Sequence, residues 1–454
     1  MGKNNARYPP YWSDQIEARI LATSCDAAFL TRRSGVREHS VCLSLRRNSH
    51  AFRYNHLAES LSLELSACMS RQNWVLTDVL KRIWHDQMSV APGGDLKLAG
   101  SESWSISKYT LRGGMSDGVD VVELNNGRLA VSIVPTRGMG LWRGMCDGLE
   151  LGWRSPVAMP VNPAFVNLIE RDGAGWLMGF NEWLCRCGLD VNGPPGSAGT
   201  LHGRIANIPA HYVELSIETD GPGTISLTGL VDETMMFGPS LRLKSTVETA
   251  AGSNRLTVID EITNLAGVPA ELELLYHTNM GRPFLEPGAR FVAPIISVVP
   301  RDRIAAEGID SFDTFAAPLA GFAEQIYYFD LAIGKDGRTE TLLKSAHGDK
   351  GVSLAFEKRQ LPCFALWKNT QSESDGYVTG LEPATNFPNL KGFERKQGRV
   401  VVLPPGAKHT ARLDIEVHST REAVAAVEKS IAGLQSGHKP QIYRQPQPKW
   451  SPFE

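Results

Sequence analysis

The chain has 454 residues, and its 47 Lys and Arg nearly balance its 49 Asp and Glu, which gives a formal net charge of −2. This balance offers no electrostatic basis for attraction to a polyanion or an anionic membrane surface. We therefore expect neither nucleic acid nor a membrane as a partner. Charged residues interrupt the first thirty residues, and no run reaches the roughly 18 apolar residues of a membrane span, so we expect neither an export signal nor a span.

The cysteines do not form a recognisable framework. There are seven of them, at positions 25, 42, 68, 146, 185, 187 and 363. An odd number fits poorly with a complete set of disulfides, and no CxxC pair has zinc-finger spacing. The pattern predicts reduced thiols, a cytoplasmic location and no metal site.

The amino-terminal segment differs from the rest of the chain. Residues 1–68 contain scattered arginine pairs and three of the cysteines, with no sustained period beyond a possible short helix over 56–69. We expect a poorly ordered extension, or translation from a start upstream of the natural one, because chain ends are where order is least expected. Met69 then opens a single predicted domain over 69–436, followed by a proline-rich tail over 437–454.

Apolar residues at three- and four-residue spacing predict a helix over 74–88. From Trp104 to His418 the period changes to short runs rich in β-branched residues, separated by turn residues, which predicts a mainly β protein of antiparallel sheets with a few peripheral helices. The clearest predicted strands are 129–134, 212–217, 224–230, 241–248, 256–263, 271–276, 351–356, 363–368 and 399–403. A last helix is predicted over 421–434, capped by Thr420, before an extended tail.

Three segments place ionisable groups at turns or strand ends. The first is a turn containing His202 and Arg204, two residues apart and hence on one face of an extended chain. The second is an apolar strand that ends in His277, with Asn279 close behind. The third places Glu382 between Leu381 and Pro383. Together they predict a site for an uncharged polyol, since Arg and His supply donors and a partly buried Glu is a better base at neutral pH.

Each of these groups also fits a structural role when taken alone, and only their combination favours a functional site. Other residues are weaker candidates for contacts with the ligand. They are Arg137 in a turn after a strand, Asn181 beside an aromatic residue, Asp232 after an apolar run, and Lys368 at a strand end. A solvated turn, a structural arginine or a surface lysine would explain these residues equally simply.

In chain order, Leu201-His202-Gly203, the strand ending at His277 and Leu381-Glu382-Pro383 resemble the active-site segments of the aldose 1-epimerase (galactose mutarotase-like) superfamily. The stretch from about 100 to 418 is most similar to a largely uncharacterised bacterial subgroup. The resemblance implies a galactose mutarotase-like β-supersandwich that interconverts sugar anomers without metal or cofactor. Glu382 would be the base and His277 the acid, and His202 and Arg204 would bind the sugar.

Two departures from the family pattern bear on the substrate. Arg204 stands where a second glycine is typical, and Ala384 stands where glutamine is common after Glu-Pro. With Arg137 and Lys368, these changes suggest a modified or acidic sugar. Two alternatives remain. One is a carbohydrate-binding or sensing protein without catalysis. The other is a lyase or hydrolase on the same scaffold, with Asp232 or Glu233 as the second carboxylate.

Overall fold

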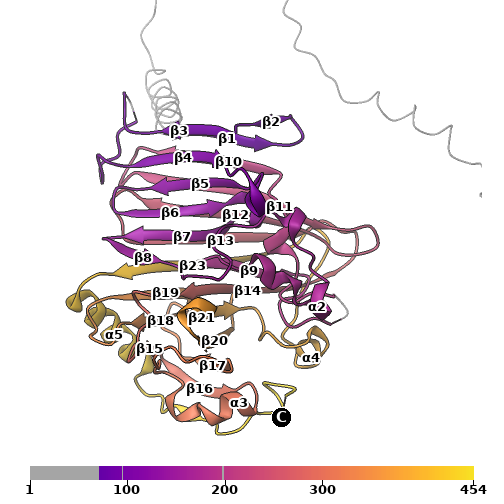
Figure 1. The fold of residues 1–454 in the computed structure, drawn as a ribbon, viewed down its shortest axis with the longest axis vertical. Helices are drawn as coiled ribbons and strands as arrows, with labels where there is room; N and C mark the ends of the chain where they lie inside the picture. The colour runs from indigo at the N-terminus through magenta and orange to yellow at the C-terminus, as the bar shows by residue number, and fades with distance from the viewer. Residues whose placement is uncertain (1–70, 95, 197–198, 454) are drawn as a thin grey trace, which may run out of the picture. The chain divides into compact units, whose positions relative to one another are not determined.

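The computed structural model describes residues 71–94, 96–196 and 199–453, which form two large β-sheets (Figure 1). Neighbouring strands are antiparallel except for the pair β16 and β24. The ten-stranded sheet runs in the order β15 (Arg290–Val292), β18 (Arg338–Lys344), β19 (Gly351–Glu357), β23 (Lys408–His418), β13 (Arg255–Asn264), β12 (Ser240–Ala250), β11 (Thr224–Thr234), β10 (Tyr212–Glu218), β1 (Arg71–Asp78) and β2 (Ile83–Trp84).

The second sheet has fourteen strands and carries the predicted histidines and Glu382. Twelve of its strands follow one another in the order β24 (Gln441–Ile442), β16 (Ile295–Pro300), β17 (Gln325–Leu331), β20 (Cys363–Thr370), β21 (Tyr377–Ala384), β14 (Ala270–Met280), β9 (Leu184–Leu189), β7 (Gly140–Cys146), β6 (Leu129–Val134), β5 (Asp120–Asn125), β4 (Ser105–Thr110) and β3 (Gln87–Val90). The short strands β22 (Val401–Leu403) and β8 (Leu149–Leu151) pair with β14 and β7.

The alternation of apolar and polar residues explains how the sheets pack. In β11 every second side chain is buried, and its register with β12 is unbroken from Thr224↔Ala250 to Thr234↔Ser240. The inward residues of both sheets join one hydrophobic cluster, which includes Leu227 of β11 and Leu274 of β14. Sheets that share a core in this way form a sandwich. The predicted β class and every strand named from the sequence are confirmed.

The sequence prediction fails at one element. Instead of a helix over 74–88 the chain forms β1, β2 and β3. Trp74 pairs with Leu215 of β10, while Val79 and Leu80 lie exposed in a turn. The helical spacing therefore did not mark a buried stripe, and strand pairing overrode it.

Short helices lie at the periphery: α2 (Glu170–Gly173), α3 (Arg303–Glu307), α4 (Lys391–Lys396) and α5 (Arg421–Gln435). The prediction of α5 is confirmed, and the Thr420 hydroxyl accepts the cap hydrogen bond from the Ala423 amide. In the tail, β24 pairs with β16, and Trp450 stacks on Phe387 at 5.2 Å. The expected extension over 1–68, its helix and Met69 lie outside the described residues. None of the described helices is long and apolar enough to cross a membrane.

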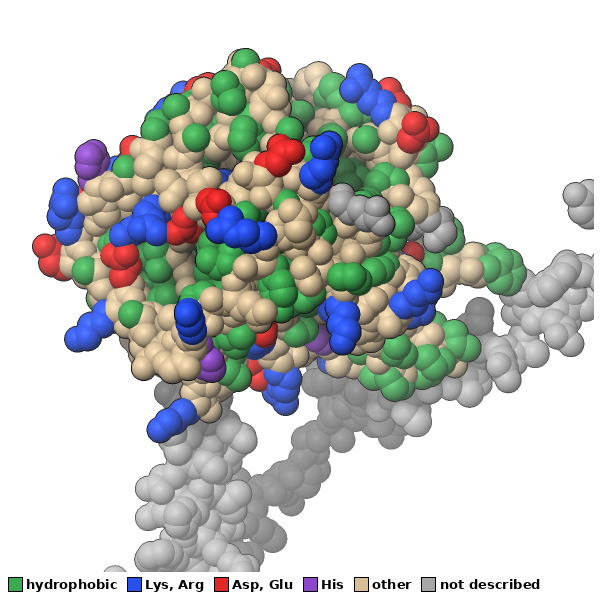
Figure 2. Space-filling view, turned by 90° about the horizontal axis from the view of Figure 1, so that it is seen from below, with side chains coloured by type: hydrophobic (Ala, Val, Ile, Leu, Met, Phe, Trp, Pro, Cys, Tyr) green, Lys and Arg blue, Asp and Glu red, His purple; other side chains and the backbone are tan. Residues whose placement is uncertain are grey.

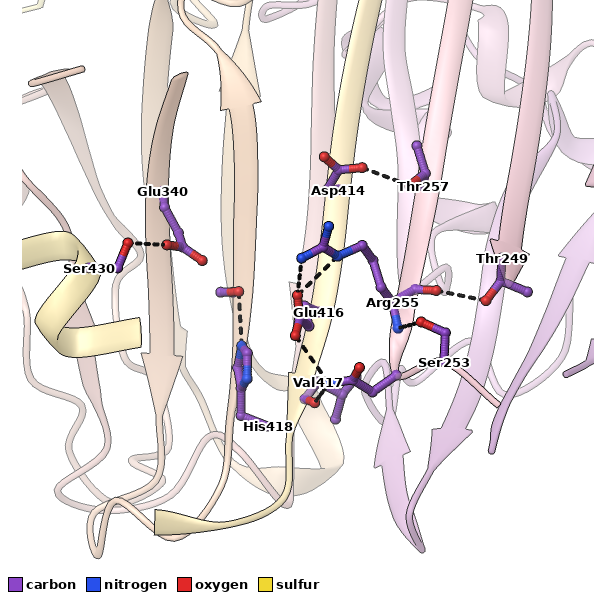
Figure 3. A network of polar contacts seen from close by, with 12 residues as sticks. Thr249, Ser253, Arg255, Thr257, Glu340, Asp414, Glu416, Val417, His418 and Ser430 are labelled. Atoms are coloured by element: carbon purple, nitrogen blue, oxygen red, sulfur yellow. Dashed lines mark hydrogen bonds and ion pairs between the residues drawn. The ribbon is translucent and has the colours of Figure 1, made fainter. Parts of the chain in front are cut away.

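Ion pairs and hydrogen bonds cross the outer face of the ten-stranded sheet (Figure 3). Arg255 of β13 binds Glu416 of β23, and the Thr257 hydroxyl donates to Asp414 at 2.7 Å. Ser430 of α5 donates to Glu340 of β18, which connects the helix to the sheet. These charged groups therefore have partners within the fold.

A different ion pair joins the two sheets inside the core. Arg186 of β9 binds Asp260 of β13 through two nitrogens, and both side chains are fully buried. The Tyr276 hydroxyl donates to the same carboxylate, and Arg186 also donates to the Ser245 hydroxyl. A buried charge is tolerated only when its hydrogen-bonding capacity is satisfied, as it is here.

We expect Asp260→Asn to lower the free energy of unfolding by about 3–5 kcal/mol, because Arg186 would keep its charge in the core without a counter-charge. Urea denaturation measures the change. The matched control is Asp232→Asn, which removes a partly exposed pair with Arg242 and should cost less than about 1 kcal/mol. Equal losses in the two variants would contradict a special role for the inter-sheet pair.

Candidate functional site

The three residues central to the sequence prediction lie together on the outer face of the fourteen-stranded sheet. The register that pairs Leu275 with Ala384 and Thr278 with Leu381 puts His277 of β14 opposite Glu382 of β21. Nε2 of His277 lies 3.2 Å from Oε1 of Glu382, and both side chains are buried. Gly380 makes this contact possible, since a Cβ there would lie 2.4 Å from Oε1.

Asn279 fixes the orientation of the His277 ring. Its amide nitrogen donates to the carbonyls of Glu182 and His277, so its oxygen faces the imidazole. Nδ1 of His277 donates to that oxygen at 2.6 Å. The neutral ring therefore carries its hydrogen on Nδ1 and presents a bare Nε2 to Glu382.

Burial sets the protonation of the pair. It lowers the pKa of His277 to about 3, and the neighbouring His202 acts in the same direction. Burial also raises the pKa of Glu382 well above its usual range, helped by the negative charge of Glu324. Both shifts favour uncharged groups, so the pair holds one proton, and this proton resides on Glu382. Oε1 of Glu382 is buried and has no well-aligned hydrogen-bond partner among the described residues, so its hydrogen-bonding capacity is unused within the fold.

His202 completes the cluster from a separate loop. It adopts a left-handed backbone with φ of +56°, followed by Gly203, where a Cβ would lie 2.2 Å from the Val191 carbonyl oxygen. Its Nδ1 donates to the Asn192 carbonyl at 2.7 Å, which leaves Nε2 as an acceptor. The ring centroids of His202 and His277 are 5.5 Å apart. Burial lowers the pKa of His202, so this ring is also neutral.

Aromatic rings surround the pair. The centroids of Phe180 and Trp367 lie 5.1 and 5.2 Å from that of His277. Both rings line an open cleft of about 680 Å³ together with Trp153, Arg301 and Glu324. Aromatic faces beside a few polar groups are typical of small-molecule sites and suit the apolar faces of sugars.

Part of this lining was not predicted from the sequence. Asn181 was a predicted contact, but Phe180, which precedes it, was not, and neither were Arg301 and Glu324. Glu324 accepts a hydrogen bond from Trp367 Nε1 at 2.8 Å and lies 3.4 Å from Arg301. No local motif marks these two residues. Arg301 lies between β16 and α3, and Glu324 lies directly before β17.

Three predicted sugar contacts lie elsewhere. Arg137 is buried and binds Glu182 and Asn207, which anchors the wall of the cleft instead of exposing a free cation. Lys368 faces away from its neighbour Trp367 and donates to the carbonyls of Ser311 and Thr314. Asp232 belongs to the ten-stranded sheet and pairs with Arg242. Successive strand residues face opposite ways, which explains the error at Lys368.

Two further predicted contacts remain at the edge of the cluster. Arg204 is exposed at the start of the 3-10 turn Ile205–Asn207. Burial raises the pKa of Glu233 to about 7, and the positive charge of Arg204 opposes that rise. Asn181 is buried and donates to the Val157 carbonyl. Within the described ranges, no group of three or more His, Cys, Asp or Glu side chains could hold a metal ion.

Comparison with known proteins places the chain in a family. A family model described as a domain of unknown function, DUF4432, matches residues 116–417. The chain belongs to this family. The DUF4432 chain is 36% identical to a Klebsiella pneumoniae protein provisionally assigned as an aldose 1-epimerase, with a TM-score of 0.79 over 83% of this chain and 99% of that one. It has the galactose mutarotase-like fold, as the sequence predicted.

More distant structures are also similar. A galactose mutarotase-like protein from Clostridium acetobutylicum is 15% identical, with a TM-score of 0.47 over 69% of this chain and 98% of that one. The galactose 1-epimerase from Lactobacillus acidophilus is 12% identical, with a TM-score of 0.47 over 70% and 100%. Among curated protein sequences, none matches the chain.

We expect the hydrogen of neutral His277 to reside on Nδ1, because the Asn279 oxygen accepts from that nitrogen. Nitrogen-15 NMR of the imidazole ring distinguishes the two tautomers at neutral pH. In Asn279→Ala the signals should shift toward a mixture of tautomers. Asn369→Ala, which removes an amide bonded to the Gly376 carbonyl at the cleft, is the control and should leave them unchanged. A wild-type ring protonated on Nε2 would contradict the assignment.

Proposed function

We propose that the protein is a mutarotase that interconverts the anomers of a reducing sugar by general acid–base ring opening. The observation that carries this proposal is the buried contact between Glu382 and His277, next to the Phe180 and Trp367 rings that line the cleft. One acid and one base, close together and sharing one proton, are what the reaction requires.

The proton path follows from the contacts of the pair. A sugar hydroxyl that donates to Oε1 of Glu382 stabilises the carboxylate, and the shared proton moves to Nε2 of His277. Glu382 then accepts the proton of the anomeric hydroxyl while Nε2 donates its proton to the ring oxygen. The bond between C1 and the ring oxygen breaks as the C1 carbonyl forms. After rotation about the C1–C2 bond, the reverse proton transfers close the ring as the other anomer.

The neighbouring groups support these transfers. The Asn279 oxygen accepts from Nδ1 and stabilises the imidazolium form of His277. The bare Nε2 of His202 accepts a hydrogen bond from a sugar hydroxyl. Phe180 and Trp367 exclude water and pack against the sugar ring. Each proton has a donor and an acceptor among these side chains, so the scheme requires no metal or cofactor.

An uncharged sugar fits the cleft better than an acidic one. Arg137 and Lys368, on which the acidic-sugar hypothesis partly rested, bind protein groups instead. Arg301 at the cleft lies beside the carboxylates of Asp302 and Glu324. A cytoplasmic location remains part of the proposal and agrees with the four described cysteines, which are all unpaired thiols.

A hydrolase is less well supported by the geometry. Glycoside hydrolysis usually uses two carboxylates flanking the scissile bond. The predicted second carboxylates lie elsewhere: Asp232 pairs with Arg242, and Glu233 is buried against the Leu189 amide. A carbohydrate-binding protein without catalysis would have the same cleft. It would differ from a mutarotase only in that it does not interconvert the anomers.

Glu382→Gln should reduce anomer exchange by about 10²–10⁴-fold, because the amide cannot accept the anomeric proton. Exchange spectroscopy by NMR measures the rate with glucose, galactose and xylose. Gly380→Ala should also slow exchange while the fold is retained, because its Cβ meets the ends of the Glu382 and His277 side chains and no backbone atom among its three nearest neighbours. Gly392→Ala, where a Cβ meets no atom, is the control. Full activity in Glu382→Gln would refute the assignment of Glu382 as the base. Sugar binding without anomer exchange in the wild type would favour a binding protein.

The rate of anomer exchange should be highest at pH values between the pKa of His277 and the raised pKa of Glu382. Exchange should fall as pH drops toward the His277 pKa of about 3, where the pair gains a second proton. It should also fall as pH rises through the raised pKa of Glu382, where the pair loses its only proton. Glu324→Gln should lower the Glu382 pKa, because it removes a nearby negative charge, and move the alkaline limb of kcat/KM to lower pH.

Glu340→Gln, on the other sheet, is the control for this pH profile and should leave both limbs in place. A rate that increases with pH through the alkaline titration would mean that only the fully deprotonated pair is active. That result would contradict the shared proton.

A further inference from the structure

A second cavity of about 440 Å³ lies on the same face of the fourteen-stranded sheet as the catalytic pair. It extends over β4, β5, β6 and β7, and its floor consists of outward side chains that include Ser105, Ser107, Asn125 and Ser132. The hollow exists because these outward positions hold small residues. Gly144 in β7 is constrained as well, since a Cβ there would lie 2.9 Å from the Ala130 carbonyl oxygen.

Trp153 borders both this cavity and the cleft lined by Phe180 and Trp367. Its Nε1 donates to the Glu182 carbonyl at 3.0 Å, and its ring lies 5.1 Å from that of Phe180. Gly281 and Gly376 pack against it, since Cβ atoms there would lie 3.0 and 2.8 Å from Trp153 atoms. The Trp153 indole is thus held in place and lines both cavities.

The lining of the second cavity suits an uncharged polyol. Hydroxyl, amide, carboxylate and guanidinium groups supply donors and acceptors in about equal measure. The charges nearly cancel, since three arginines accompany two glutamates: Arg143, Arg154, Arg282, Glu123 and Glu150. Charges of both signs are also interspersed on the face shown in Figure 2.

We propose that the two cavities form one binding groove for a neutral oligosaccharide. The reducing-end ring reaches His277 and Glu382, and the following rings pass Trp153 into the cavity over β4 to β7. Each cavity alone falls in the range of roughly 300–1,000 Å³ that holds one small molecule, so the two together accommodate more than a single sugar ring. This inference rests on the proposed mutarotase function and specifies its substrate class.

The test compares anomer exchange of monosaccharides with that of trisaccharides ending in the same ring. The probes are glucose with maltotriose, galactose with β-1,4-galactotriose, and xylose with xylotriose, each with the full-length protein. For at least one pair, we expect kcat/KM to be about tenfold or more higher for the trisaccharide, a difference of about 1.4 kcal/mol.

Ser107→Trp fills the second cavity away from the catalytic pair. It should remove the trisaccharide advantage and leave the monosaccharide rate unchanged. Ser226→Trp, on β11 of the other sheet, should change neither rate. The proposal is overturned if no trisaccharide is preferred, or if Ser107→Trp slows both sugars equally.

If the wild-type protein exchanges the anomers of no sugar, the proposed function fails, and saturation-transfer NMR then tests the groove separately. Contacts to the second and third rings of a trisaccharide that disappear in Ser107→Trp would support the groove. Their absence from the wild type would overturn it.

Discussion

The buried ion pair between Arg186 and Asp260 is the interaction on which the rest of this structure depends. It joins β9 to β13 across an otherwise apolar core, with Tyr276 of β14 bonded to the same carboxylate. Because strand residues alternate, the neighbours of Arg186 and Tyr276 face outward. The ion pair and its bond to Tyr276 hold β14 with Tyr276 facing the core. His277 follows Tyr276 directly, so its imidazole lies on the outer face.

Glu182 contacts both the residue that orients His277 and the tryptophan of the proposed groove. Its carbonyl accepts hydrogen bonds from Asn279, which orients His277, and from Trp153, which lines both cavities. Its carboxylate is held by buried Arg137. A single residue thus positions the acid and the aromatic boundary of the groove, although it touches neither the proton nor the sugar in our scheme. Arg137, predicted as a ligand contact, acts through this residue.

The sequence predicted most of the fold because period-two alternation, as in Val213, Leu215 and Ile217, is a direct consequence of a sheet with one buried face. It also indicated His202, His277 and Glu382, since ionisable groups in glycine-containing turns or next to apolar runs are unusual. It could not predict which face a residue takes where both faces are buried, as in β20 and β21, and Lys368 was therefore misplaced. Glu324 and Arg301 reach the cleft by tertiary packing alone, which leaves no trace in local sequence.

The central claim is that the anomeric centre of a sugar binds between Glu382 and His277. The most direct test is a crystal structure of Glu382→Gln soaked with galactose. Our account predicts the anomeric oxygen within about 3 Å of the residue 382 side chain and the ring oxygen within about 3 Å of His277 Nε2, as hydrogen bonds require. A sugar bound in the cleft with C1 directed to solvent, away from both residues, would contradict it.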